Sequence, residues 1–260
     1  MLTVNSVHSK VLPYRDVKES FEVESRDRRR AATLAEIKAA ARRLLVSGGS
    51  TAVGLRAVAR ELGLTPPALY RYFPSHDALI GALIADLYDE LTAALMQLQT
   101  TEEVPDLGER LYLLANGLRN WGLEHPAEFA LLFGTAVPIA DADDHDETPG
   151  HQAAMRFGAV FKELVAQIWH WKPFPYPPDE LLGKELIAQL TEESEHFQGM
   201  PPGAIYLSLT YWTRLYGLIC MEVFGQLHWV LPDAAAYFEA QLREIGEALG
   251  LDCPPPDDKT

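Results

Sequence analysis

Cysteine is scarce in this sequence, and long apolar runs are absent from it. Cys220 and Cys253 are the only cysteines among 260 residues, too few for a disulfide framework or a cysteine-based zinc site. The most apolar stretch, 203 to 232, is interrupted by charged residues such as Arg214 and Glu222, and the N-terminus lacks the apolar run of a signal peptide. We therefore expect a cytoplasmic protein with reduced thiols.

The signatures of the common enzyme and metal classes are also missing. The sequence has no G-x-S-x-G turn, no Gly-rich phosphate loop, no H-E-x-x-H pair and no dinucleotide fingerprint. Glu193 and His196 have the spacing of half a di-iron site, but no second pair exists. The acidic segment 141 to 149 lacks the central Gly and the closing Glu of a calcium loop. We expect no catalytic residue, no metal and no cofactor.

The charges are unevenly distributed along the chain, whose formal net charge is −15. Residues 1 to 80 hold 13 Lys and Arg against 8 Asp and Glu, whereas the rest of the chain holds 9 against 29. Because phosphate binding needs a positive surface, only the N-terminal part suits nucleic acid. The charge pattern thus predicts two domains.

Helical periodicity runs through most of the chain, and no segment has a convincing strand pattern, so the expected fold is all-α. Thr33 and Glu36 have the spacing of a capping box, which predicts that the first helix begins there and ends at Gly48. Further helices are expected at about 55 to 62, 65 to 73, 75 to 100, 106 to 124, 126 to 135, 151 to 170, 179 to 197, 203 to 229 and 233 to 249.

The segment from 55 to 73 has the pattern of a helix-turn-helix. Such a unit needs a small residue where the helices cross, a residue that tolerates positive φ in the turn, and apolar residues that anchor the second helix. Ala59, Gly63, Leu69 and Tyr72 occupy those places. This spacing alone fits an ordinary helical corner equally well.

A longer string favours DNA binding. The segment from 31 to 82 resembles the DNA-binding domain of the tetracycline-repressor (TetR) family, above all in R-A-V-A-R-E-L-G-L-T from 56 and A-L-Y-R-Y-F-P-S from 68. The resemblance implies a three-helix DNA-binding domain joined through a long fourth helix to a helical ligand-binding and dimerisation domain. The expected organisation is a mobile arm over 1–25, a helix-turn-helix domain over 26–76, the helical domain over 77–252 and a disordered tail over 253–260.

The resemblance also implies which residues contact DNA. Arg71 is predicted to read guanine, Ala68 to contact a thymine methyl group, and Tyr70 and Tyr72 to donate to phosphates, although Tyr72 fits core packing equally well. The basic run before the first helix is expected to add phosphate contacts, with a solvated segment as the alternative. The expected DNA-binding residues are Arg28, Arg29, Arg30, Thr33, Arg56, Thr65, Pro66, Pro67, Ala68, Tyr70, Arg71, Tyr72 and His76.

The sequence departs from the family's pattern at three places. Gly54 stands where the family favours Thr, so it offers no hydroxyl to a phosphate. Pro66 and Pro67 cannot donate backbone hydrogen bonds. His76 stands where a phosphate-binding Lys is usual, and a neutral imidazole weakens that contact. We therefore expect specificity to depend on Arg71.

The C-terminal half resembles one TetR subgroup more weakly, in W-G-L-E-H-P-A-E-F from 121 and R-L-Y-G-L from 214. The resemblance implies a small molecule between the middle helices, which would stabilise a dimer whose recognition helices are spaced wrongly for DNA. The identity of this ligand is not indicated by the sequence. The expected ligand-binding residues are Trp121, His125, Phe129, Phe133, Phe157, Phe161, Trp169, Trp212 and Tyr216.

Two late helices carry apolar seams with steps of three and four residues. Since the family pairs its last two helices with those of a second copy, the resemblance implies a homodimer that reads a palindromic operator. A seam that fills only the chain's own core is the alternative. The expected interface residues are Ile205, Leu209, Ile219, Val223, Phe238, Leu242, Ile245 and Leu249.

The sequence thus favours a ligand-responsive transcriptional regulator, expected to be a repressor, although the sequence does not decide between repression and activation. The alternatives are a helical small-molecule-binding protein or enzyme without DNA binding, and a helical interaction protein whose acidic half binds basic partners. Neither alternative predicts affinity for DNA at low salt.

Overall fold

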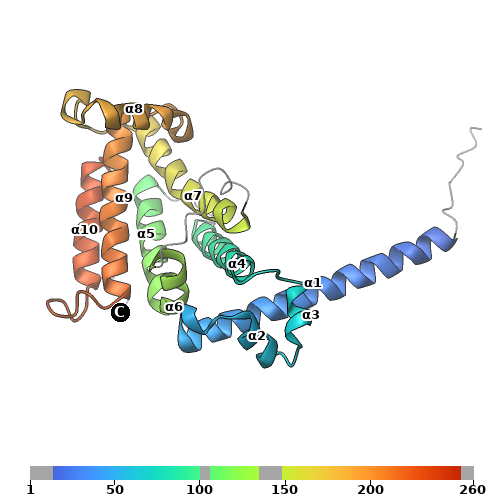
Figure 1. The fold of residues 1–260 in the computed structure, drawn as a ribbon. Coiled ribbons are helices and arrows are strands. Elements are labelled where there is room, and N and C mark those ends of the chain that lie inside the picture. The colour runs from blue at the N-terminus through green and yellow to red at the C-terminus, as the bar shows by residue number, and fades with distance from the viewer. Residues whose placement is uncertain (1–13, 100–105, 135–147, 253–260) are drawn as a thin grey trace, which may run out of the picture. The chain divides into compact units, whose positions relative to one another are not determined.

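The computed structural model describes residues 14–99, 106–134 and 148–252, and the side chains from Ser25 onward. All regular structure in these ranges is helical, with no strand, which confirms the predicted all-α class (Figure 1). The tail 253–260 and most of the acidic segment 141–149 lie outside the described residues. The helices are α1 (Tyr14–Gly48), α2 (Leu55–Glu61), α3 (Pro66–Tyr70), α4 (His76–Gln97), α5 (Leu107–Glu124), α6 (Pro126–Phe129), α7 (Pro149–Trp171), α8 (Lys184–Glu192), α9 (Pro202–Val223) and α10 (Ala235–Ala248).

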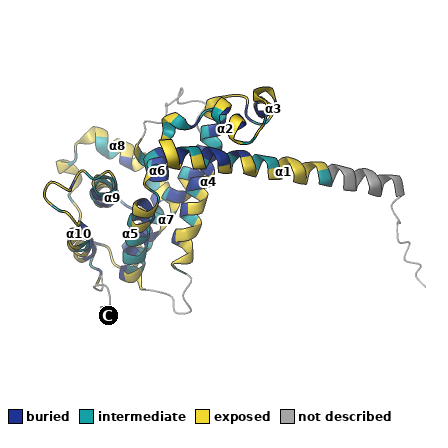
Figure 2. Cartoon of the chain, turned by 90° about the horizontal axis from the view of Figure 1, so that it is seen from below, coloured by how far each residue is buried: buried dark blue, intermediate teal, exposed yellow. Residues whose placement is uncertain are grey.

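The chain divides into two compact units, unit 1 (Met1–His76) and unit 2 (Asp77–Thr260). In unit 1, α2 packs against both α1 and α3. The second half of α1 supplies one apolar face, and α2 and α3 close over it, as the burial pattern shows (Figure 2). The side chains that are at most 2% exposed in this unit are Ile37, Ala40, Ala41, Leu45, Val53, Val58, Ala59 and Leu69.

The start of α1 differs from the prediction. The helix begins at Tyr14, so residues 14–25 of the expected arm are helical, while residues 1–13 lie outside the described residues. The Thr33 hydroxyl donates to the Arg29 carbonyl at 3.0 Å, one turn back within the helix, and does not cap a helix end. No Pro or Gly occurs between 14 and 47, and the charged residues there are mostly good helix formers, so nothing breaks the helix at Thr33.

In unit 2, α9 packs against α5, α8 and α10, and α5 also packs against α7 and α10. A buried ion pair joins α5 to α9: the Arg119 Nε donates to Glu222 Oε2 at 2.7 Å, and each side chain is 11% exposed. The Arg119 guanidinium also lies 5.2 Å from the centre of the Phe238 ring on α10. One arginine thus connects three helices of the unit.

Some helices of unit 2 are shorter than predicted. The segment 126–135 consists of α6 followed by a π-helical segment, Ala130–Gly134. The segment 179–197 contains the short α8 between two 3₁₀ turns, because Gly183 has a positive φ of 79°. Helix α9 ends at Val223, since Gly225 adopts a φ of 68° and starts a turn. Within the described ranges, no helix is long and apolar enough to cross a membrane.

Candidate functional site

Helices α2 and α3 form the predicted helix-turn-helix of unit 1. Gly63, in the turn, has a φ of 66°, and the Leu64 amide donates to the Ala59 carbonyl at 2.8 Å. Leu69 is fully buried, so its side chain anchors α3 in the core of unit 1. Thr65 precedes α3 with extended backbone but makes no capping bond through its side chain. The helix ends at Tyr70, before the predicted end at Phe73, so α3 has only five residues.

The outer face of α3 is open to solvent. Thr65, Pro66, Pro67 and Tyr70 are exposed, and Ala68 is half-buried. Because both prolines lack an N–H, this face offers shape and apolar atoms at its front and a hydroxyl at its rear. An element of this kind can lie against base edges without competing backbone donors.

Two concave surfaces of unit 1 include residues of α3 or of the turn after it. The α2 hollow has a volume of about 710 Å³, and the α1 hollow one of about 380 Å³. The side chains lining the α2 hollow include two arginines and no carboxylate, and those lining the α1 hollow include four arginines and one carboxylate. The α2 hollow is lined by Thr51, Ala52, Gly54, Leu55, Arg56, Ala57, Arg60, Tyr70, Pro74, Ser75 and His76, and the α1 hollow by Arg26, Asp27, Arg29, Arg30, Thr33, Arg71 and Tyr72.

In the α1 hollow, the Arg30 guanidinium lies 5.3 Å from the centre of the Tyr72 ring. This cation–π contact fixes the arginine over the turn that follows α3. Tyr72 is half-buried, so its ring packs against unit 1 while its edge remains accessible. Tyr72 can therefore pack in the core of unit 1, as one interpretation requires, and still present its hydroxyl to a phosphate, as the other requires. Arg28 is exposed but does not line the hollow.

In the α2 hollow, the Nε2 of His76 lies 2.7 Å from the Val53 carbonyl oxygen. Since a carbonyl can only accept, Nε2 carries the hydrogen and donates it. This bond holds the first residue of α4 against the segment before α2. Gly54 follows with extended backbone, φ −140° and ψ 149°, as the residue before α2. His76 therefore has a positioning role that the sequence did not reveal.

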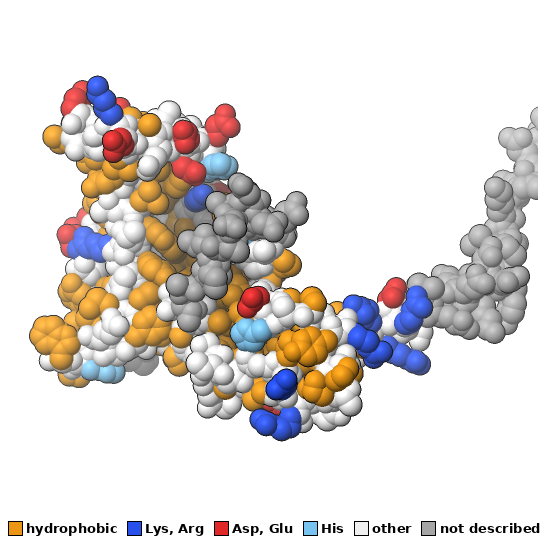
Figure 3. All heavy atoms as spheres, viewed as in Figure 1, with side chains coloured by type: hydrophobic (Ala, Val, Ile, Leu, Met, Phe, Trp, Pro, Cys, Tyr) orange, Lys and Arg blue, Asp and Glu red, His pale blue; other side chains and the backbone are white. Residues whose placement is uncertain are grey.

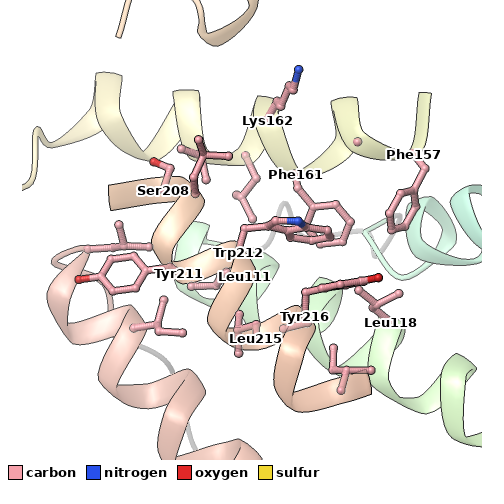
Figure 4. A pocket seen from close by; sticks show the side chains of 18 of the residues that line it. Leu111, Leu118, Phe157, Phe161, Lys162, Ser208, Tyr211, Trp212, Leu215 and Tyr216 are labelled. Atoms are coloured by element: carbon pink, nitrogen blue, oxygen red, sulfur yellow. The ribbon is translucent and has the colours of Figure 1, made fainter. Parts of the chain in front are cut away.

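A cavity of about 380 Å³ lies inside unit 2, between α5, α7, α9 and α10 (Figure 4). Its lining includes five of the predicted ligand-binding residues, Phe133, Phe157, Phe161, Trp212 and Tyr216. Their rings contact one another, and Phe133 is central: its ring centre lies 5.7 Å from Tyr88, 5.8 Å from Phe157 and 5.6 Å from Tyr216.

The other four predicted ligand residues lie elsewhere in unit 2. Phe129 is fully buried in the core, and Trp121 is 7% exposed with its ring 5.1 Å from His125. Trp169 packs against Phe174 at 5.2 Å. None of these four residues is among those lining the cavity. This cavity gives no support to these four, because an aromatic spacing does not indicate which neighbour covers the ring, and their role as ligand contacts stays a prediction.

The cavity wall carries almost no charge. Among the described lining residues only Lys162 is ionisable to a full charge at neutral pH, and its Nζ lies 3.9 Å from Glu193 Oε2 and 5.3 Å from the Phe197 ring. The Tyr88 hydroxyl donates to the Leu132 carbonyl at 3.4 Å, and burial raises the pKa of Tyr88 to about 12. Burial likewise raises the pKa of Tyr216, so both phenols remain neutral.

The predicted dimer seam faces the chain's own core. Six of its residues are at most 3% exposed within the single chain, whereas Leu209 is 40% exposed and Val223 is half-buried. A partner chain has little access to side chains that are already covered, so the single chain gives no support to those six, and their place in a dimer interface stays a prediction. A seam marks the face that a helix buries and does not say what covers it. The covered residues are Ile205, Ile219, Phe238, Leu242, Ile245 and Leu249.

Two protein families match the chain. The family of bacterial regulatory proteins of the tetR type matches residues 37–83, and the tetracyclin repressor-like C-terminal domain matches residues 111–245, just over half of the chain. The chain belongs to the TetR family. TetR proteins are DNA-binding transcriptional regulators with a helix-turn-helix, which confirms the resemblance stated above.

Similar proteins support this assignment. The HTH-type transcriptional regulators Rv1816 of Mycobacterium tuberculosis and Mb1846 of Mycobacterium bovis are each 29% identical over 218 residues, 83% of this chain and 91% of theirs. The solved structure of the regulatory protein SCO4313 is 31% identical, with a TM-score of 0.64, over 84% of this chain and 97% of that one. A TetR family transcription regulator from Shewanella sp. PV-4, 18% identical, shares the fold with a TM-score of 0.54 over 83% of this chain and 96% of that one.

The TetR matches cover the two sites unequally. The N-terminal match begins at residue 37, after all the arginines of the α1 hollow except Arg71. The C-terminal match begins at Leu111, so Tyr88 is the one cavity residue that lies before it. These parts of the two sites are therefore features of this chain that the family matches do not describe.

Several site residues were missed by reasoning from the sequence. Arg60 lines the α2 hollow one helical turn after Arg56, and that four-residue spacing was a usable signal. Tyr88, Ser208 and Tyr211 line the cavity, and nothing in their spacing distinguishes them from core residues. Leu209, Ile219, Ile245 and Leu249, which were assigned to the dimer seam, line the cavity as well.

Proposed function

We propose that this protein is a homodimeric repressor that binds a palindromic operator and is released from it by a small molecule held in unit 2. The observation that carries the proposal is the combination of an exposed α3 beside two arginine-lined hollows with an apolar cavity in the other unit. Membership of the TetR family supports each part. We propose that it acts without catalysis and in the cytoplasm, where the operator is.

We propose that α3 enters the major groove and that the two hollows take the phosphates of the two backbones that border it. Tyr70 lines the α2 hollow, whereas Arg71 and Tyr72 line the α1 hollow. A guanidinium binds a phosphate through two parallel hydrogen bonds, so each hollow can hold at least one phosphate. Phosphate contacts of this kind set affinity and register, and they leave sequence preference to α3 and to Arg71, the residue that follows it.

We propose that the dimer forms through the open face of α9, opposite its buried seam. The residues of this face recur every three or four positions and are exposed or half-buried. Figure 3 shows mostly hydrophobic and uncharged side chains over the part of unit 2 where α9 lies. A Cβ added at Gly217, in its middle, would meet no atom of the chain within 4 Å, so another helix can approach closely there. Tyr237 of α10, 44% exposed, extends the surface. The α9 face consists of Tyr206, Thr210, Thr213, Gly217 and Met221.

We propose that the π-helical segment Ala130–Gly134 couples the cavity to α4. The Tyr88 hydroxyl of α4 donates to the Leu132 carbonyl, and the Tyr216 hydroxyl of α9 donates to the Phe133 carbonyl at 3.2 Å. A ligand that displaces the Phe133 ring therefore acts on Tyr88 through both its ring and its hydroxyl. Because α4 begins at His76, the last residue of unit 1, this movement reaches the DNA-binding residues along one helix.

Selection of bound fragments from genomic DNA, followed by footprinting, tests the DNA-binding proposal. We expect a protected palindrome whose half-sites lie about one helical turn apart, with affinity that falls steeply as salt rises. The matched control is the Arg30→Ala/Arg71→Ala double variant, which keeps the core of unit 1 and lacks two hollow arginines. Fragments enriched no further by the unaltered protein than by this variant, even at low salt, would overturn the proposal and favour a helical binding protein without DNA.

Arg71→Ala is expected to relax sequence preference at one position in each half-site and to cost about 1 to 3 kcal/mol of binding free energy. The reason is that guanidinium recognises guanine through two donors, which alanine lacks. The measurement is a binding titration on operators with single base changes. Arg30→Ala is the comparison, because its loss should be equal on all sequences and should lower the salt slope. A loss for Arg71→Ala that is also equal on all sequences would make Arg71 a phosphate contact.

A further inference from the structure

The cavity of unit 2 excludes charged ligands by its lining. No carboxylate, arginine or histidine is among the described residues that line it. The ammonium of Lys162 is turned toward Glu193 and away from the cavity (Figure 4). The aliphatic part of the Lys162 side chain is therefore what lines the cavity. A charged group that enters would lose its hydration without gaining a counter-ion, which costs several kcal/mol or more.

The shape of the lining favours a flat occupant. The rings of Trp212 and Tyr216 are nearly parallel, with an interplanar angle of 19°, and together they form one wall. The Phe161 ring meets Trp212 at 4.7 Å and Phe157 at 5.3 Å, and so continues that aromatic surface. Aromatic rings pack best when offset or edge to face, and a flat ring system can do both here. The volume of about 380 Å³ lies at the small end of ligand cavities, which suits two or three fused rings.

Two polar groups of the lining donate to no part of the chain that the structure describes, the Trp212 indole N–H and the Tyr211 hydroxyl, and Figure 4 shows the Tyr211 hydroxyl directed away from Trp212. Tyr88 and Tyr216 already donate their hydroxyl hydrogens to backbone carbonyls, and Ser208 donates to the Ala204 carbonyl at 2.8 Å. Figure 4 shows the Trp212 indole nitrogen among the lining side chains, and no residue that the structure describes accepts its hydrogen. An indole N–H can only donate, so it selects an acceptor.

We propose that the cavity binds an uncharged, flat aromatic molecule of two or three fused rings whose carbonyl or similar acceptor takes the hydrogen bond of the Trp212 indole. The proposal rests on the proposed ligand-responsive function, and it names the class of ligand. An aliphatic chain would fill the volume but would gain no ring stacking. A cation would gain attraction from the ring faces, but the parallel Trp212 and Tyr216 rings cover each other's faces in part.

Calorimetric titration of the full chain with five defined probes tests the ligand class. The probes are 2-acetonaphthone, 2-ethylnaphthalene as the same shape without an acceptor, 2-naphthoate as an anion, 1-methylquinolinium as a cation, and 2-decanone as an aliphatic acceptor. We expect 2-acetonaphthone to bind tightest, 2-ethylnaphthalene about two- to tenfold more weakly through loss of one hydrogen bond, and both ions at least about tenfold more weakly. Equal or tighter binding of the cation, the anion or 2-decanone would overturn the proposal, as would the absence of binding by every probe.

The variant Trp212→Phe tests the named hydrogen bond, because it keeps an aromatic ring and removes the N–H. Affinity for 2-acetonaphthone should fall about two- to tenfold further than affinity for 2-ethylnaphthalene, because both probes lose part of the ring contact with Trp212 but only 2-acetonaphthone loses the hydrogen bond. Trp229→Phe is the matched control: Trp229 is 84% exposed and outside the cavity, so neither affinity should change. An equal loss for both probes in Trp212→Phe would refute the hydrogen bond. If this variant fails to fold, the ranking of the five probes on the unaltered protein still decides the ligand class.

Operator release, measured separately, keeps this inference distinct from the proposed function. Addition of 2-acetonaphthone to the DNA complex is expected to lower DNA affinity. If the probe binds the free protein with the expected ranking but leaves DNA affinity unchanged, the ligand class stands and the regulatory role of the cavity fails. If a charged compound both binds the cavity and releases DNA, the regulatory role stands and the ligand class fails.

Discussion

Arg119→Leu is expected to lower the free energy of unfolding by about 3 to 5 kcal/mol. The substitution leaves the Glu222 carboxylate, 11% exposed, without its bidentate partner between α5 and α9. It also removes the cation that lies over the Phe238 ring and links these helices to α10. The measurement is chemical unfolding at one fixed protein concentration, so that any association of chains affects every variant equally.

The double variant Arg119→Leu/Glu222→Leu shows how much of that loss comes from the stranded charge. Two leucines of similar volume leave no buried ion, so we expect most of the stability to return. Arg156→Leu is the control, because its pair with Asp89 joins side chains that are 54% and 52% exposed and should contribute less than about 1 kcal/mol. A double variant as unstable as Arg119→Leu would mean that the pair acts through its geometry and not through the cost of an unpaired charge.

Leu69→Ala is expected to cost about 2 to 5 kcal/mol and to abolish DNA binding. Leu69 is fully buried, and it is the only buried residue of α3, which has five residues. A helix this short has no stability of its own, so its position depends on that one anchor. The measurements are thermal unfolding and operator affinity.

Two comparisons identify the cause of the Leu69→Ala effect. Val46→Ala, at a side chain that is 59% exposed, should change stability by less than about 0.5 kcal/mol and leave DNA binding intact. Binding of 2-acetonaphthone by Leu69→Ala should persist, because the cavity lies wholly in unit 2. If Leu69→Ala lost both operator binding and 2-acetonaphthone binding, the two units would not fold independently.

The helix-turn-helix could be predicted because its signals are local. Gly63 at the turn, Leu69 as the anchor and Pro66 at the first position of α3 each act within a few residues of their place in the chain. The start of α1 was predicted wrongly for the same reason. The spacing of Thr33 and Glu36 is that of a helix start, but the pattern does not show that the preceding residues are helical too.

The cavity could be predicted only in part because it depends on contacts that are distant in the sequence. Helical periodicity showed that Trp121 and Trp212 face inward, yet Trp121 packs against His125 while Trp212 lines the cavity. Likewise, Ile219 and Ile245 were assigned to an apolar dimer seam, and in the structure they are buried by the chain's own helices beside the cavity. Which inward-facing residues meet a void is decided by the packing of whole helices.

In the proposed arrangement, natural selection can act through the α1 hollow on the affinity for any DNA, and separately through α3 on the preference for one operator. Three of its arginines, Arg26, Arg29 and Arg30, lie on α1 before the residues matched by the TetR family, whereas α3 lies within them. If these arginines hold phosphate and α3 reads the operator, as proposed above, substitutions in that stretch of α1 change the affinity for any DNA without altering the face that distinguishes one operator from another. A lineage carrying this helix can therefore adjust how fully a promoter is occupied while keeping the same set of target genes.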